Sequence, residues 1–210
     1  MNEFDRSVFI NCPFDDDYRP LLLALLFTIR YLDYIPRLAL DKSDSSETRI
    51  DKILKIIDES KFGIHDLSRL KAVKKGDISR MNMPFELGID FGLKRLKPGQ
   101  WKGKEILVLE KTKYEIQKAL SDLSGSDTKA HGNEPRILVT AVRDWIVNSI
   151  EHSTEKVSGA AIWREYNYLN TFLHEKLVVE KGHHNIDDVS ITEINNLMAK
   201  WFILKTENQR

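Results

Sequence analysis

The side chain best suited to chemistry in this sequence is the carboxylate of Glu86, in the segment Asn82-Met83-Pro84-Phe85-Glu86-Leu87-Gly88. Pro84 is typical of the first turn of a helix, where its missing N–H costs no hydrogen bond. The apolar neighbours of Glu86 and the space beside Gly88 favour a reactive carboxylate, which can act as a nucleophile or stabilise a cationic sugar centre. The structural alternative is an acidic residue that only complements the helix dipole.

Asp66 is the second carboxylate of interest. It lies near the end of the segment Lys61-Phe62-Gly63-Ile64-His65-Asp66-Leu67, which is typical of a strand that ends at the His65-Asp66 pair. Ligands of open parallel sheets bind beyond the carboxyl ends of the strands, where the strand order reverses. We therefore expect residues 11–14, 65–68 and 82–86 to meet there, with Asp66 binding ribose hydroxyls or protonating a leaving base. The other residues expected to bind substrate in these segments are Asn11, Cys12, Pro13, Phe14, His65, Ser68, Asn82 and Met83.

Other catalytic schemes find less support. The sequence has no Gly-x-Gly-x-x-Gly motif, no Walker loop and no His/Cys cluster with zinc-ligand spacing. The lone Cys12 is either a nucleophile or, as its apolar context favours, a small core residue. His131 is expected in a solvated loop near the strand ends, and His183-His184 in a polar turn. We therefore expect neither a metal nor a bound cofactor.

The acidic triplet Asp15-Asp16-Asp17 also has two interpretations. It precedes an apolar run from Tyr18 to Leu32 that is typical of a helix. Negative charge is favourable near a helix N-terminus, so capping is preferred over a metal site, for which no other ligands lie nearby in the sequence.

Strands and helices alternate along the first three quarters of the chain, which predicts an α/β fold: a flavodoxin-like, doubly wound, mainly parallel sheet of four or five strands. The apolar pattern places strands at residues 7–12, 34–40, 61–67 and 105–110 and a short edge strand at 127–131, with helices at 18–32, 47–60, 84–96, 113–123 and 134–151.

A polar linker at residues 152–158 separates this α/β domain, residues 1–151, from a small helical appendage at 159–205. The appendage is expected to contain two helices, at 160–180 and 190–202. Trp145, Trp163 and Trp201 fall in helical apolar patterns and are expected in the core or in an interface. Trp163, Tyr166, Leu169 and Phe172 would give one helix an apolar face for a homo-oligomer.

Composition and charge limit the partners. Lys and Arg together number 32, and so do Asp and Glu, which gives no general attraction to nucleic acid or to anionic membranes. The longest apolar run, Leu21 to Phe27, is far shorter than the about 20 residues that cross a bilayer. The first residues do not resemble a signal peptide, so the cytoplasm is the expected location.

Short motifs follow one another along the chain in a recognisable order: Val8-Phe9-Ile10-Asn11-Cys12-Pro13-Phe14, then Gly63-Ile64-His65-Asp66-Leu67-Ser68-Arg69, then Phe85-Glu86-Leu87-Gly88. This order resembles the nucleoside 2-deoxyribosyltransferase family and the architecturally similar TIR domains, and is most similar to an uncharacterised bacterial branch of that superfamily. The resemblance covers residues 7 to about 150. It implies that Glu86 is a nucleophile in cleavage of an N-glycosidic bond and that Asp66 binds substrate.

Two departures from the family pattern affect the expected substrate. Arg80 stands where the deoxyribosyltransferases usually have an acidic residue, and Cys12 replaces a usual Gly or Ala. Basic Arg37, Arg69 and Arg80 suit a substrate with phosphates. NAD has phosphates and a good leaving group, which needs little help from an acid.

The leading hypothesis is therefore an N-glycosidase, such as an NAD glycohydrolase or a nucleotide N-ribosyl hydrolase or transferase. Two alternatives remain open. One is a module of the same fold that senses a nucleotide signal or another protein without turnover. The other is an effector switched on by assembly through the C-terminal helices. A role in bacterial anti-phage defence would rest on analogy between folds.

Overall fold

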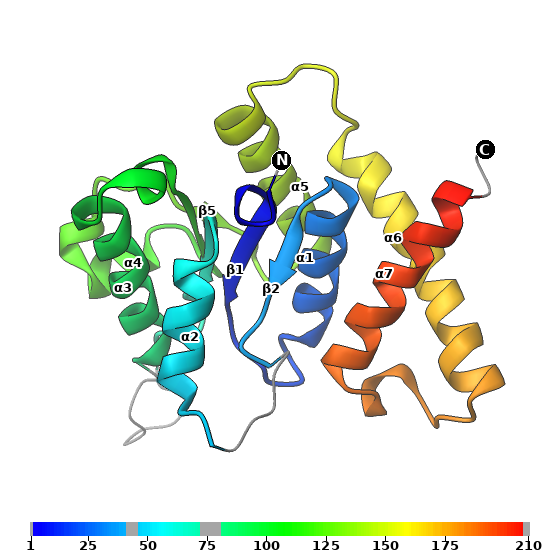
Figure 1. Ribbon diagram of the computed structural model, residues 1–210. Helices are drawn as coiled ribbons and strands as arrows, with labels where there is room; N and C mark the ends of the chain where they lie inside the picture. The colour runs from blue at the N-terminus through cyan, green and yellow to red at the C-terminus, as the bar shows by residue number, and fades with distance from the viewer. Residues whose placement is uncertain (1, 41–45, 72–80, 208–210) are drawn as a thin grey trace.

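The strands of the computed structural model, which describes residues 2–40, 46–71 and 81–207, form one parallel sheet with helices on both faces (Figure 1). The strand order is β2-β1-β3-β4-β5, and every pairing is parallel. This is the flavodoxin-like order, so the predicted fold class is confirmed. The strands are β1 (Ser7–Asn11), β2 (Ile35–Arg37), β3 (Phe62–Asp66), β4 (Glu105–Glu110) and β5 (Lys129–Ala130).

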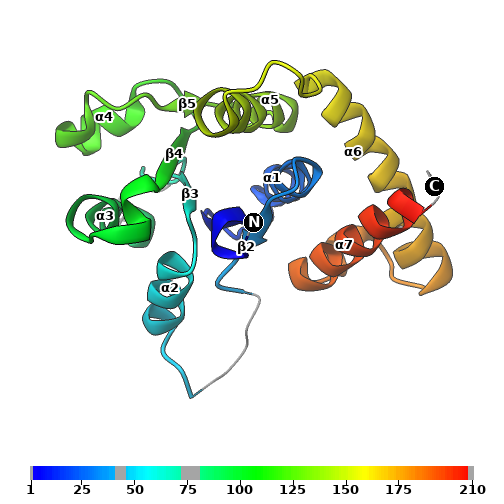
Figure 2. The same ribbon diagram turned by 45° about the horizontal axis from the view of Figure 1, so that its top comes forward.

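The helices separate into two layers. Helices α1 and α5 cover one face, and α2, α3 and α4 cover the other, while α6 and α7 lie outside α1 and α5 (Figure 2). Helices α5 and α6 each continue as a π-helical turn, Ile146–Glu151 and Glu175–Glu180. The helices are α1 (Arg19–Tyr31), α2 (Arg49–Asp58), α3 (Asn82–Leu96), α4 (Glu115–Ala119), α5 (Pro135–Trp145), α6 (Gly159–His174) and α7 (Ile191–Glu207).

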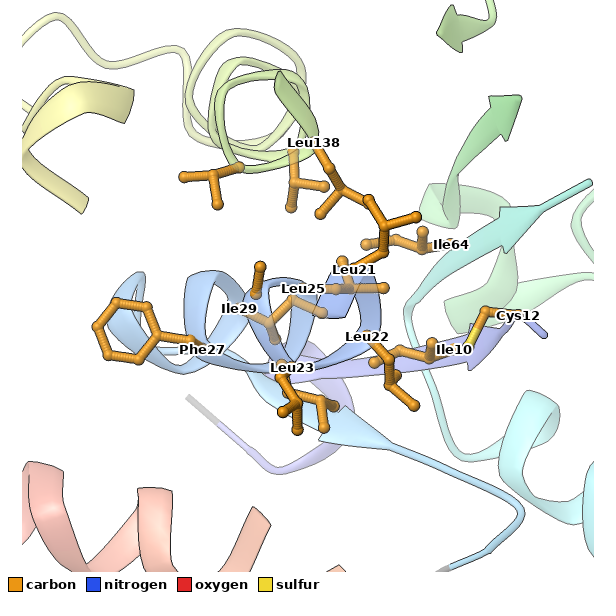
Figure 3. Packing of buried hydrophobic residues seen from close by; sticks show 14 of the residues in the cluster. Ile10, Cys12, Leu21, Leu22, Leu23, Leu25, Phe27, Ile29, Ile64 and Leu138 are labelled. Atoms are coloured by element: carbon orange, nitrogen blue, oxygen red, sulfur yellow. The ribbon is translucent and has the colours of Figure 1, made fainter. Parts of the chain in front are cut away.

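The main core surrounds α1. Nine consecutive residues, from Leu21 to Ile29, are buried, because the sheet covers one side of the helix and α5, α6 and α7 cover the others. A helix that is apolar all round is stable in water only when it is enclosed in this way. Figure 3 shows Leu21, Leu22 and Leu25 of α1 close to Ile10 of β1 and Ile64 of β3.

The C-terminal helices belong to the same core. Ile162 and Leu169 of α6 and Met198 of α7 are fully buried in the cluster that contains α1. Of the side chains that suggested an oligomer interface, Tyr166 and Leu169 are buried, and Trp163 and Phe172 pack against the cluster. That apolar face therefore packs largely within the chain itself, and an oligomer through the C-terminal helices stays a prediction.

Several elements are shorter than predicted, and for two of them the local geometry gives the reason. The expected strand 34–40 is paired only at Ile35–Arg37, because it is an edge strand and Pro36 has no N–H to donate. The expected helix 113–123 forms an α-helix only at Glu115–Ala119. Tyr114, with φ at 70°, precedes it, so Lys113 and Tyr114 cannot continue the helix. None of the described helices has the length and apolar character that crossing a membrane requires.

The start of α6 packs closely against α5. A Cβ atom at Gly159 would lie 2.7 Å from Oγ1 and 3.1 Å from Cα of Thr140. We expect Gly159→Ala to lower the free energy of unfolding by about 1–3 kcal/mol, because the backbone of α5 cannot yield as a side chain would. Gly92→Ala is the control, since it lies within α3 with open space around it and should stabilise the helix by up to about 1 kcal/mol. Denaturant unfolding measures both, and equal effects would contradict this packing.

Candidate functional site

The carboxyl ends of β1 and β3 lie side by side, with Asn11 directly opposite His65. The strand order reverses at this point, since β1 is followed by β2 on one side and β3 by β4 on the other. Ligands of such sheets bind at this position. The predicted meeting of residues 11–14, 65–68 and 82–86 agrees with this arrangement: Asn11 contacts both His65 and Met83.

His65 and Asp66 project to opposite faces of the sheet, as neighbouring residues of a strand must. The His65 ring contacts Asp90 of α3, on the face covered by α2, α3 and α4. Asp66 contacts Tyr18 and His131, which precede the two helices of the other face. The candidate site therefore has two halves, separated by the strand ends.

Glu86 is a residue of α3 and belongs to the half of the site on the face covered by α2, α3 and α4. Its side chain is only 6% exposed, and no described residue forms a hydrogen bond with its carboxylate. Burial raises the pKa of Glu86 to about 7, with the charge of Arg49, at the start of α2, acting in the opposite direction. A poorly solvated carboxylate with no hydrogen-bond partner among the described residues is reactive when ionised, as a nucleophile or a cation-stabilising group must be, and a perturbed pKa is typical of functional sites. The sequence analysis did not identify Arg49.

Cys12 connects the two halves. Burial raises the pKa of the thiol well above its usual value, and the charges of Asp66, Glu86 and Asp15 raise it further. Both candidate carboxylates are thus close enough to influence one thiol. Cys12 is 3% exposed and remains protonated, which fits the interpretation as a core residue better than that as a nucleophile.

Asp66 is fully buried and surrounded by donors. Its Oδ2 accepts a hydrogen bond of 2.6 Å from the Tyr18 hydroxyl, and its Oδ1 accepts one of 2.9 Å from the N–H of Ser68. Burial opposes ionisation, but His131, Ser68 and Tyr18 outweigh it and hold the pKa of Asp66 below its usual value. Asp66 is therefore a fixed anion, and the expectation that it protonates a leaving base does not agree with this geometry.

His131 is fully buried beside Asp66 rather than solvated, so the sequence interpretation was wrong on this point. Its Nδ1 accepts a hydrogen bond of 3.0 Å from the N–H of Asn133, so the ring proton is on Nε2. Nε2 lies 2.9 Å from Oδ2 of Asp66, off the direction of an ideal hydrogen bond. The neutral ring therefore presents its N–H edge to the carboxylate.

A second buried network holds the start of α3. The Asn11 amide donates to the carbonyl oxygen of Met83 at 2.8 Å and contacts Nδ1 of His65 at 3.0 Å. A carbonyl can only accept, so the Asn11 nitrogen faces both groups, and Nδ1 of His65 is unprotonated. The proton on Nε2 is then donated to Oδ2 of Asp90 at 2.9 Å. The strand end is thus tied to the turn that carries Glu86.

Lys104, the residue directly before β4, completes this network. Its ammonium group lies 3.0 Å from Oδ1 of Asp90, and neither side chain is exposed. Burial lowers the pKa of Lys104, and Asp90 opposes that shift. Gly63 permits the approach, because a Cβ there would lie 2.2 Å from Oδ2 of Asp90. The sequence analysis missed Asp90, although it lies one helical turn after Glu86 and therefore on the same face of α3.

The two predicted arginines that the structure describes, Arg37 and Arg69, have acidic partners other than Glu86. Arg37 forms ion pairs with Glu3 and Glu59, and Glu59 lies at the opposite end of α2 from Arg49. Arg69 forms two hydrogen bonds, of 2.9 and 3.2 Å, with the carboxylate of Asp15. Arg80 lies outside the described residues.

The other predicted substrate-binding residues differ in their surroundings. Pro13 is buried next to Cys12, and Phe14 packs against the main core. Asn82 is exposed at the first residue of α3, and the Met83 side chain is buried in a cluster with Leu67 and Leu87. No group of three or more His, Cys, Asp or Glu residues in the described part of the chain is arranged to hold a metal.

A hollow of about 670 Å³ between α3 and α5, along β4, contains none of these candidate residues. We do not assign the functional site to this hollow, although it is large. None of the acidic residues that line it is buried as Glu86 is. It also lies along β4, toward the edge of the sheet, rather than where the strand order reverses.

Lys104→Met tests the second network. Removing one member of a buried ion pair leaves the other charge unpaired, so we expect a loss of about 3–5 kcal/mol in the free energy of unfolding. The same change at Lys129, whose pair with Asp127 is largely exposed, should cost no more than about 1 kcal/mol. Asp90→Asn combined with Lys104→Met should recover part of the loss. A double variant no more stable than Lys104→Met would contradict the ion-pair account.

Comparison with protein-family models, with curated proteins and with solved structures finds no match to this chain.

Proposed function

We propose that this chain cleaves the N-glycosidic bond of a nucleotide such as NAD, by hydrolysis or by transfer to another acceptor. The observation that carries the proposal is Glu86, a residue only 6% exposed near the point where the strand order reverses. The choice of an N-glycosidic substrate rests on the resemblance of the motifs around Glu86 and Asp66 to the deoxyribosyltransferases.

In the proposed reaction, the leaving base departs with the electron pair of the C–N bond, and positive charge develops at the sugar. The Glu86 carboxylate stabilises that charge or bonds to the anomeric carbon. Water or a second acceptor then attacks the same carbon and loses its proton. A nicotinamide leaving group departs as a neutral molecule, so the reaction needs no acid.

The protein's own residues support such a step by keeping the carboxylate in place. Asn11 holds the carbonyl of Met83, three residues before Glu86, and Asn11 is itself held by His65. A group fixed in this way reacts without first reorganising its surroundings. The nearby Asp66 supplies a second negative charge that remains ionised.

A second candidate is a binding module that recognises a nucleotide without converting it. One observation favours it: both oxygens of Asp66 already have partners within the protein, so Glu86 would have to act without a second reactive carboxylate. Binding of NAD observed by calorimetry, with no base released, would support this module over the enzyme.

Glu86→Gln tests the enzyme. The substitution keeps the shape of the side chain and removes its negative charge, so we expect base release from NAD to fall by at least about 100-fold. Glu175→Gln, at an exposed position in the π-helical turn that follows α6, is the matched control and should retain wild-type activity. Chromatography measures the nicotinamide released from NAD, and the free base released from a panel of other nucleotides and nucleosides. Equal rates in wild type and Glu86→Gln would refute the role of Glu86.

The pH dependence of the wild-type reaction provides a second test. The pKa of Glu86 is raised to about 7 by burial, and the proposed role requires the ionised form. Since the ionised fraction increases with pH, kcat/KM should rise through an apparent pKa of about 7 and reach a plateau above it. A rate that instead falls as pH rises through 7 would indicate that Glu86 acts as an acid.

A further inference from the structure

A separate hollow of about 420 Å³ lies beyond the carboxyl ends of β3 and β4. One wall is formed by the residues directly after β3, and the other by the segment that leads from β4 into α4 and by α4 itself. The residues that line it are Leu67, Ser68, Arg69, Leu70, Lys71, Lys111, Thr112, Glu115, Lys118 and Ala119.

The charge of this hollow is strongly positive. Lys71 is paired with Glu115 at 2.5 Å, and Arg69 is paired with Asp15. Lys111 and Lys118 have no acidic partner among the described residues. Their charges are therefore free to attract an anion.

The carboxylate of Glu110, the last residue of β4, already has its hydrogen-bond partners within the protein. It is buried and accepts hydrogen bonds from the N–H groups of Tyr114, Glu115 and Ile116. The start of α4 is thus already capped by the protein. An anion in the hollow would be held by the lysines rather than by that helix end.

The hollow also offers hydroxyl groups. The Ser68 Oγ is buried and has no hydrogen-bond partner among the described residues. A buried hydroxyl without a partner is costly, so rotation of this side chain toward an acceptor in the hollow would be favourable. The Thr112 hydroxyl, on the opposite wall, forms no hydrogen bond within the described part of the chain either. Ammonium and hydroxyl donors, with the single carboxylate already paired, suit a ligand that is rich in acceptors, as a phosphate is.

The hollow adjoins the candidate site. The N–H of Ser68 binds Asp66, so the wall of the hollow begins immediately after that residue. Leu67 lines the hollow and packs in one cluster with Met83 and Leu87, which lie on either side of Glu86 in the sequence. A ligand whose sugar lies near Glu86 could therefore extend into the hollow.

We propose that this hollow binds the phosphate groups of the nucleotide substrate, through Lys111 and Lys118 together with Ser68 and Thr112. The inference rests on the proposed function for its substrate. Phosphate recognition is thereby assigned to Lys111, directly after β4, and to Lys118 of α4. Arg37 and Arg69, suggested by the sequence, are instead held in ion pairs within the protein.

Pyrophosphate is a direct probe of the hollow. We expect calorimetry to show that it binds the wild-type chain, and that Lys111→Ala combined with Lys118→Ala weakens its binding by at least about tenfold, since two charge-assisted contacts are lost. The control is Lys102→Ala combined with Lys200→Ala, which removes the same charge from exposed positions outside the hollow and should leave binding unchanged. Equal weakening by both pairs, or by neither, would overturn the proposal.

A competition experiment connects the hollow to the substrate without requiring turnover. NAD should displace pyrophosphate from Glu86→Gln, in which bond cleavage is blocked. Simultaneous, independent binding of the two would overturn the assignment to the substrate.

Kinetics separate this inference from the proposed function. The Lys111/Lys118 variant should show a KM for NAD raised about tenfold or more, with kcat little changed and with no effect on nicotinamide riboside, which lacks phosphate. An unchanged KM for NAD would refute the role of the lysines even if Glu86 is catalytic. Competitive binding of NAD and pyrophosphate without any base release would refute the enzyme and retain the phosphate site.

Discussion

The buried ion pair between Lys104 and Asp90 is the interaction on which the arrangement of the site depends. Two charges without exposure to water are unfavourable unless each has its partner and further hydrogen bonds. Lys104 is satisfied by Asp90 and by the carbonyl oxygens of Ile57 and Ser60, and Asp90 by His65 as well. The orientation of α3 relative to β3 is thereby fixed, and with it the position of Glu86, one turn before Asp90.

Much of the fold follows from the sequence because the apolar pattern has few physical solutions. Strands of a buried parallel sheet are nearly continuously apolar, as the segments 8–10 of β1 and 62–64 of β3 are, and the polar residues of both strands lie at their ends. Helix α1 is apolar on all sides, which the sequence shows but does not explain. The explanation lies in α6 and α7, which are distant in the sequence and enclose it. Local patterns reveal that a segment is buried without revealing what buries it.

The site was predictable in part. The turn at Pro84 and the apolar neighbours of Glu86 identified a carboxylate that is indeed buried and without a described partner. Lys104 was not predictable, since a lysine before a strand is expected in solvent. His131 was misjudged because its burial depends on Asp66, 65 residues earlier in the sequence. Arg37 and Arg69 were misjudged because the sequence does not show that an acidic partner within the protein, Glu59 or Asp15, already neutralises the charge.

The enclosure of α1 by α6 and α7 has a consequence for the order of events during synthesis. Helix α1 ends at residue 31, whereas α7 ends at residue 207. At about 5–20 residues per second, a continuous apolar helix leaves the ribosome roughly ten seconds or more before the last of its covering helices has been made. During that interval the nascent chain presents leucine-rich surface to its surroundings, so the chain should engage chaperones until its C-terminal helices arrive.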